Sequence, residues 1–183
     1  SRSQATSWKR QSTGTLIVLG YHRIANGGAS EFDDSLFGPD QDEFRKQMIW
    51  LKKHREVLAL DEVIAIAKDG ANIPKNAVAV TFDDGYADNY DLALPILEHL
   101  SVPATFFISC DLVSSGTVGW WDELAYMLAH TEQKGLSIRD REFALPEEQM
   151  LARQYLQSLF KLEPAATTAN LLDEVSQLLG TSR

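Results

Sequence analysis

Two adjacent aspartates, Asp83 and Asp84, follow an apolar run directly in the stretch VAVTFDDGY (78–86). Two carboxylates this close repel each other unless a cation or a shared proton offsets their charge. Adjacent residues that leave a strand point in different directions, so one carboxylate can hold a metal ion while the other faces a substrate or a bound water. The pair therefore predicts a divalent cation. The alternative is that DDGY is only a turn, because Asp and Gly are common turn residues.

The acidic pair ends a predicted strand of a predicted α/β domain. Residues 77–82 show no alternation with polar residues, which indicates a strand buried on both faces. Strands alternating with helices favour an α/β fold with a largely parallel sheet or barrel, whose ligands lie beyond the carboxyl ends of the strands. The other strands predicted in this part are buried strands at 15–24, where Gly20 closes the apolar run, and at 102–109, with a short strand at 56–60. The predicted helices are 42–54, 61–69 with Asp61 as its N-cap, and 88–100, which Pro95 kinks or restarts.

The composition changes after Cys110. Residues 112 to 183 are predicted to be mostly helical, apart from a small hairpin at 136–145. Pro146 and Pro164 are each expected to begin a helix, and Gly180 to end the last one. Cys110 is the only cysteine, so an intrachain disulfide is excluded, and we expect this residue to fill a small space in the core.

The overall composition is that of a soluble globular protein. The chain has 183 residues, 44% of them hydrophobic, and a formal net charge of −9, which argues against a nucleic-acid partner. No apolar run approaches the roughly 20 residues of a membrane span. Residues 1–14 are polar, without a signal-peptide core or an initiating Met, and are expected to be a flexible lead-in. A cytoplasmic location is favoured, and cell-envelope association stays open if the N-terminus is truncated. The oligomeric state is not indicated.

The sequence also resembles a known enzyme family. TFDDGY followed by LPILEHLSVPATFFIS closely resembles the first catalytic motif and the next strand of the polysaccharide deacetylases, carbohydrate esterases with a NodB-type domain. LGYHRI resembles the first strand of many members, and F-x3-M-x2-L followed by LDEV resembles the stretch between. The resemblance runs from about Thr15 to Leu112. It implies part of a distorted (β/α) barrel over 15–112, and GWWDELAYML with the helices after it resembles a mainly helical insertion, over 113–183, of a bacterial subgroup.

The resemblance implies metal-dependent removal of an acetyl group from an N-acetylated oligo- or polysaccharide. By similarity, Asp83 is the general base and Asp84 is a ligand of a divalent ion, commonly zinc. This chemistry is coherent, because a metal lowers the pKa of its bound water and polarises the amide carbonyl while a carboxylate removes the water's proton.

The family's remaining metal ligands are missing from the sequence. Members of the family supply two histidines four residues apart, downstream of the ATFF strand. The four histidines of this chain are His22, His54, His99 and His130, and no two of them are four apart. We expect the chain to be the N-terminal portion of a longer enzyme. The alternative is a degenerate member that binds a glycan without hydrolysing it.

Three further residues are candidates for substrate binding. His22 lies at the end of the first predicted strand and can line the same mouth as the acidic pair, or merely bond to nearby backbone. Tyr86 can stack on a sugar or anchor the turn. Trp121 can form a sugar platform with Trp120, although packing of the insertion onto the barrel is the favoured explanation for both. A rival enzyme class is Mg²⁺-dependent phosphoryl transfer, which also uses paired aspartates, but the flanking sequence does not resemble those families.

Overall fold

The computed structural model describes residues 14–25, 32, 36–162 and 164–181. The chain divides into two compact units, the first made of residues 1–26 and 38–109 and the second of residues 27–37 and 110–183. Each unit has its own cluster of buried hydrophobic residues. The predicted lead-in lies outside the described residues except for Gly14, and the predicted division into 15–112 and 113–183 remains a prediction.

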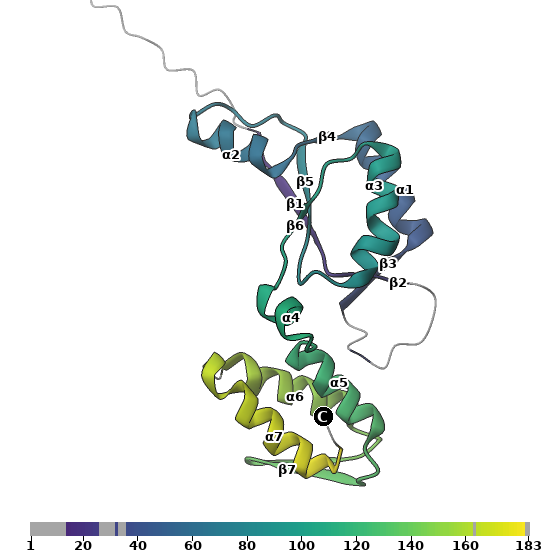
Figure 1. Cartoon of the computed structure of the whole chain (residues 1–183), viewed down its shortest axis with the longest axis vertical. Helices are drawn as coiled ribbons and strands as arrows, with labels where there is room; N and C mark the ends of the chain where they lie inside the picture. The colour runs from purple at the N-terminus through teal and green to yellow at the C-terminus, as the bar shows by residue number, and fades with distance from the viewer. Residues whose placement is uncertain (1–13, 26–31, 33–35, 163, 182–183) are drawn as a thin grey trace, which may run out of the picture. The chain divides into compact units, whose positions relative to one another are not determined.

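A parallel four-stranded sheet forms the centre of the first unit (Figure 1). Strand β5 pairs with β1 on one side and, on the other, with β4 near its start and with β6 at its end. The α/β class is therefore confirmed, whereas the barrel and the helical insertion remain predictions. The elements are β1 (Ile17–Tyr21), β2 (Arg23–Ala25), β3 (Phe37–Asp40), α1 (Gln41–His54), β4 (Glu56–Val57), α2 (Leu60–Lys68), β5 (Ala77–Phe82), a π-helix (Asn89–Ala93), α3 (Leu94–Leu100) and β6 (Thr105–Phe106).

Strand β5 is the most deeply buried strand of the first unit. All six of its residues are buried, as the unbroken apolar run predicts. Val80 and Phe82 belong to one hydrophobic cluster with Phe44 and Met48 of α1 and with residues of α3. Helices α1 and α3 lie side by side along this part of the unit (Figure 1). The strand that carries the acidic pair is thus anchored by the core.

The strands beside β5 are shorter and more exposed than predicted. Strand β1 ends at Tyr21, and Ile17 and Val18 are 44% and 53% exposed. The predicted strand at 102–109 reduces to β6, after which Phe107 and Ile108 are half exposed. A run of apolar residues indicates a strand but does not show whether both of its faces are covered.

Helix boundaries in the first unit follow the prediction with small shifts. Helix α1 buries Phe44, Met48 and Leu51, the three residues at helical spacing, and the Asp40 side chain caps its N-terminus. The N-cap of α2 is Ala59, so the prediction of Asp61 was wrong by two residues, and Asp61 lies in the first turn instead.

The second unit consists of helices and one hairpin. The hairpin confirms the hairpin predicted at 136–145. The core of this unit includes Leu124, Leu156 and Val175. Cys110 is exposed, so the prediction of a core position was wrong: the residue begins a short surface helix. The elements are α4 (Cys110–Ser115), α5 (Trp120–His130), β7 (Gly135–Ile138), β8 (Arg141–Ala144), α6 (Gln149–Leu162), a 3-10 helix (Ala165–Thr167) and α7 (Thr168–Leu179).

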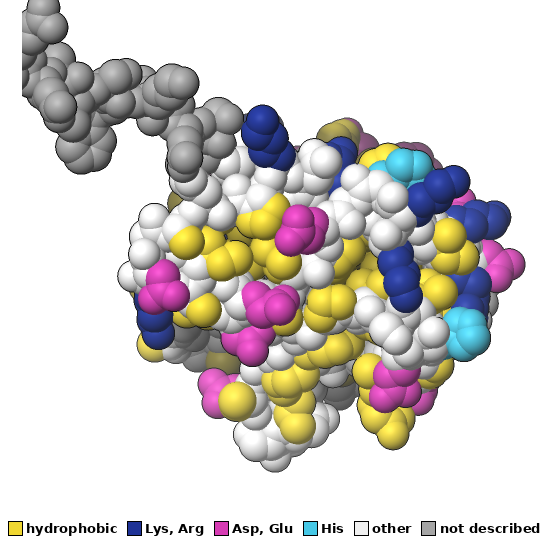
Figure 2. All heavy atoms as spheres, turned by 90° about the horizontal axis from the view of Figure 1, so that it is seen from above, with side chains coloured by type: hydrophobic (Ala, Val, Ile, Leu, Met, Phe, Trp, Pro, Cys, Tyr) yellow, Lys and Arg dark blue, Asp and Glu magenta, His cyan; other side chains and the backbone are white. Residues whose placement is uncertain are grey.

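In the second unit, Gly180 ends a helix at the predicted position, whereas Pro146 does not begin one. Gly180 caps α7 in the left-handed conformation, as predicted. Helix α6 begins at Gln149, three residues later than predicted from Pro146, because the hairpin and a turn take up the residues before it. None of the helices described here is both long and apolar enough to cross a membrane. On the face of the molecule that Figure 2 shows, hydrophobic side chains are interspersed with acidic, basic and histidine side chains.

Candidate active site

The acidic pair lies at the carboxyl end of β5, as predicted from the sequence. The backbone N–H of Asp83 donates to the carbonyl oxygen of Tyr21 at 2.9 Å, so the first residue after β5 is tied to the end of β1. A Cβ placed on Gly20 would lie 4.0 Å from Oδ2 of Asp83, so this carboxylate lies close to the last residues of β1. Asp83 and Asp84 are both half-buried. One carboxylate group is therefore positioned by two neighbouring strand ends.

The backbone after Asp83 forms a tight turn of unusual conformation. Asp84 and Gly85 have φ angles of 70° and 75°, in the left-handed region. Asp is one of the few residues that adopts this region with little difficulty, and such backbone is frequent at functional sites. DDGY is therefore a turn, as the simpler alternative states, and it is a turn that holds two carboxylates at a strand end.

We expect Gly85→Ala to destabilise the first unit by about 2 kcal/mol, because an L-residue at positive φ is strained and the new Cβ would lie 3.0 Å from Cδ1 of Ile108. The measurement is the free energy of unfolding in urea. Gly70→Ala is the matched control, since Gly70 also has positive φ (62°) but has open space around its Cα; it should cost about 1 kcal/mol. Equal losses in the two variants would show that the Ile108 contact has no effect.

A network of polar contacts joins the segment after β1 to the segment after β5. Nε of Arg23 donates to Oδ2 of Asp88 at 3.0 Å, and the backbone N–H of Ile24 donates to Oδ1 of Asp88 at 2.9 Å. Nδ2 of Asn89 donates to the carbonyl oxygen of His22 at 2.8 Å. The chain around His22 is therefore fixed at the same edge of the sheet as the acidic pair, although His22 and Asn89 are 67 residues apart in sequence.

The two aromatic candidates lie in different units. The guanidinium carbon of Arg23 is 4.5 Å from the centroid of the Tyr86 ring, a cation–π contact that favours the anchoring alternative for one face of this ring. Trp121 belongs to the second unit, where it packs edge-on against Trp120, and Trp120 stacks on Phe160 at 4.7 Å. A role of either aromatic residue in sugar binding stays a prediction.

The described residues do not complete a metal site. No group of three or more His, Cys, Asp and Glu side chains able to hold a metal ion is found among them. Catalytic zinc ions use three protein ligands, so Asp84 needs partners that this part of the chain does not supply. The donor set among the described residues thus does not fit a catalytic zinc ion by itself.

The other three histidines lie at helix ends, as predicted. His54 and His130 are the last residues of α1 and α5, and the Nδ1 atom of each lies within hydrogen-bonding distance of the carbonyl oxygen four residues earlier. His99 is in the last turn of α3 and is exposed. These positions suit favourable contacts with the helix dipole.

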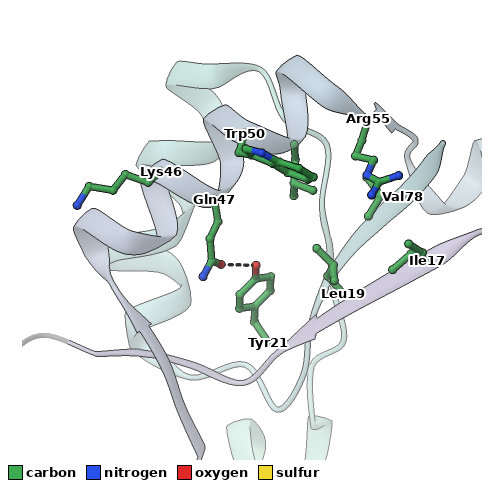
Figure 3. A pocket seen from close by; sticks show the side chains of 9 residues that line it. Ile17, Leu19, Tyr21, Lys46, Gln47, Trp50, Arg55 and Val78 are labelled. Carbon is green, nitrogen blue, oxygen red and sulfur yellow. Dashed lines mark hydrogen bonds between the residues drawn. The ribbon is translucent and has the colours of Figure 1, made fainter.

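A groove of about 580 Å³, which the sequence does not predict, lies between β1 and α1 (Figure 3). The Tyr21 hydroxyl donates to Oε1 of Gln47 at 2.7 Å within this groove, and burial raises the pKa of Tyr21. Trp50 and Leu19 contribute to an otherwise largely apolar lining that includes no carboxylate and no imidazole. The groove therefore lacks the acid–base groups of the acidic turn, which remains the candidate active site.

Sequence comparison finds similarity over the part of the chain that carries the acidic turn. Residues 70–151 match the model of the polysaccharide deacetylase family, a segment that includes β5 and the acidic turn. The resemblance found in the sequence is thus confirmed for this segment.

Curated relatives are similar over the same part of the chain. A poly-β-1,6-N-acetyl-D-glucosamine N-deacetylase of Staphylococcus aureus (strain MSSA476) is 32% identical over 104 residues, which cover 51% of this chain and 36% of the relative. The enzyme of the same name from Staphylococcus epidermidis (strain ATCC 35984) is 32% identical over 111 residues, covering 55% and 38%. The chain thus spans little more than a third of the length of these relatives.

Two solved structures have lower sequence identity to this chain than these relatives have. The structure of IcaB from Ammonifex degensii is 21% identical, with coverage of 90% of this chain and 82% of that one and a TM-score of 0.48. The Streptococcus pyogenes deacetylase PplD in complex with acetate is 16% identical, covering 92% and 70%, with a TM-score of 0.44.

Proposed function

We propose that this chain takes part in the metal-dependent hydrolysis of acetamide groups on an N-acetylated sugar polymer. The observation that carries the proposal is the turn of Asp83, Asp84 and Gly85 at the carboxyl end of β5, inside the segment that matches polysaccharide deacetylases. Ligands in parallel α/β folds lie beyond this end of the sheet, and a carboxylate pair there is suited to activating water.

In the proposed reaction Asp83 is the general base. Its carboxylate accepts a proton from a water molecule, whose oxygen forms a bond to the carbonyl carbon of the acetamide. The C–N bond then breaks, the amine nitrogen takes up a proton, and the products are acetate and a free amino sugar. Asp84 is proposed as one ligand of a divalent ion, most simply zinc, with the other ligands supplied from outside the described residues. When bound, such an ion polarises a carbonyl and acidifies water.

The substrate we propose is a polymer of β-1,6-linked N-acetylglucosamine. This follows from the names of the curated relatives, which are poly-β-1,6-N-acetyl-D-glucosamine N-deacetylases. Such a polymer is uncharged before the reaction, so it suits a chain with a net charge of −9 better than a polyanion does. His22, Tyr86 and Trp121 are the residues proposed to contact the sugar.

The test is release of acetate from oligomers of β-1,6-linked N-acetylglucosamine by the protein that contains this chain, with and without added zinc. Zinc-dependent release supports the proposal. Saturable binding of the oligomers without any release would instead identify a glycan-binding protein. That second candidate is favoured by one observation, the lack of a three-ligand group among the described residues.

We expect this 183-residue chain alone to show no tight 1:1 zinc binding in a calorimetric titration, because the described residues include no group of three or more His, Cys, Asp and Glu side chains able to hold the ion. Asp84→Ala is the control and should behave like the unmodified chain. Tight binding that Asp84→Ala abolishes would contradict this expectation and would show that the chain completes the site from its own residues.

A further inference from the structure

We infer that Asp88 is a positioning residue, which holds His22 at the acidic turn by fixing the two residues that follow it, through the side chain of Arg23 and the backbone of Ile24. This inference rests on the proposed function, since it concerns the same site. Asp88 lies five residues after Asp83, in helical backbone directly before the π-helix, and neither the motif nor the general-base role accounts for its contacts.

Both oxygens of the Asp88 carboxylate bind the segment after β1. Oδ2 accepts from Nε of Arg23 at 3.0 Å, while Oδ1 accepts from the backbone N–H of Ile24 at 2.9 Å and from Nδ2 of Asn89 at 3.1 Å. The Arg23 and Asp88 side chains are only 16% and 12% exposed. Charge-assisted bonds with little access to water are stronger than exposed ones, so this carboxylate fixes the backbone of the segment firmly.

Asn89 extends the same attachment to His22. Its side chain is 3% exposed, and Nδ2 donates to two acceptors, the carbonyl oxygen of His22 and Oδ1 of Asp88, which fixes the orientation of the amide. Asn89 also begins the π-helix, a local structure that is often found at functional sites.

The contacts follow one another residue by residue along the segment after β1. The carbonyl oxygen of Tyr21 binds the backbone of Asp83, that of His22 binds Asn89, and the next residues bind Asp88. The imidazole of His22, in contrast, makes no hydrogen bond with any described residue and is half-buried. His22 is thus held by its backbone and left with an unused side chain at the edge where Asp83 lies, which is what a substrate-contacting group requires. A displacement of about 1 Å in such a group can lower a rate about 100-fold.

The test compares Asp88→Asn with Asp91→Asn. Asn is isosteric with Asp but loses the charge that pairs with Arg23; Asp91 is an exposed residue of the π-helix and serves as the matched control. The first measurement is the NMR resonance of the His22 imidazole in the 183-residue chain, assigned by its loss in His22→Gln. The second measurement is the kcat and KM of acetate release by the protein that contains this chain. Thermal unfolding confirms that each variant is folded at the assay temperature.

We expect Asp88→Asn to shift the His22 resonance and to lower kcat about 10- to 100-fold in the folded protein, with Asp91→Asn changing neither. A merely structural role would lower the unfolding temperature but leave both measurements of the folded protein unchanged, and that result would overturn the inference. If Asp88→Asn does not fold, Arg23→Lys takes its place, because it keeps the charge but moves the donor; an unshifted His22 resonance there also overturns the inference. Absence of acetate release in the unmodified protein would instead refute the proposed function, and the resonance would still decide the role of Asp88.

Discussion

Asp83→Asn should lower the rate of acetate release by about 100- to 10,000-fold, the range that a general base contributes. The amide cannot accept a proton from water at neutral pH, whereas the backbone N–H of residue 83 still donates to the Tyr21 carbonyl oxygen, so the turn keeps its place. The measurement is kcat for the proposed polymer with excess zinc, and the loss should be in kcat, because the base acts on water rather than on the sugar.

Asp91→Asn is the control, since it removes one negative charge from an exposed position close in sequence. It should retain full activity. If Asp83→Asn also retained it, Asp83 would not be the base, and the assignment by family resemblance would fail even if the protein deacetylates sugars. An inactive variant that had lost its folded structure would be uninformative, so circular dichroism of both variants accompanies the assay.

The acidic turn was predictable because the residues that indicate it are adjacent in the sequence. An unbroken apolar run predicts a buried central strand, and two charges directly after it predict a strand end, so the sequence alone places Asp83 and Asp84 at the sheet edge. The left-handed conformation of Asp84 was not predictable in the same way. Gly85 indicates that the turn needs positive φ, but the sequence does not show that the residue before it shares that conformation.

The attachment of His22 was missed because it depends on pairs far apart in the chain. Arg23 and Asp88 are 65 residues apart, and each alone looks like an ordinary charge beside a strand or a helix. Only the parallel pairing of β1 with β5, which aligns Tyr21 with Phe82, brings the two following segments together. The prediction that Cys110 and Ile108 are buried was wrong for a related reason. The positions of Cys110 and Ile108 depend on what covers them, and the apolar run before them carries no information about coverage.

Phe82→Ala should have the largest effect on stability, lowering the free energy of unfolding of the first unit by about 3–5 kcal/mol. Phe82 is completely buried, and its ring stacks on Phe106 at 4.8 Å and on Tyr21 at 5.3 Å and meets Phe44 edge-on. Truncation leaves a cavity among three aromatic rings. These rings cannot move in to fill the cavity without losing contacts of their own. Urea unfolding followed by the amide NMR signals of each unit measures the loss.

The matched variant in the second unit is Leu156→Ala, which should cost about 2–5 kcal/mol there. Leu156 is also completely buried, but in the separate cluster that includes Leu124 and Val175. Because the two clusters share no residue, each variant should shift the unfolding midpoint of its own unit and leave that of the other within error. A single common transition, shifted by both variants, would contradict this and would mean that the chain unfolds as one cooperative unit. The acidic turn would then be destabilised by changes anywhere in the helical part, whereas separate transitions would allow that part to vary with little effect on the strand that carries Asp83.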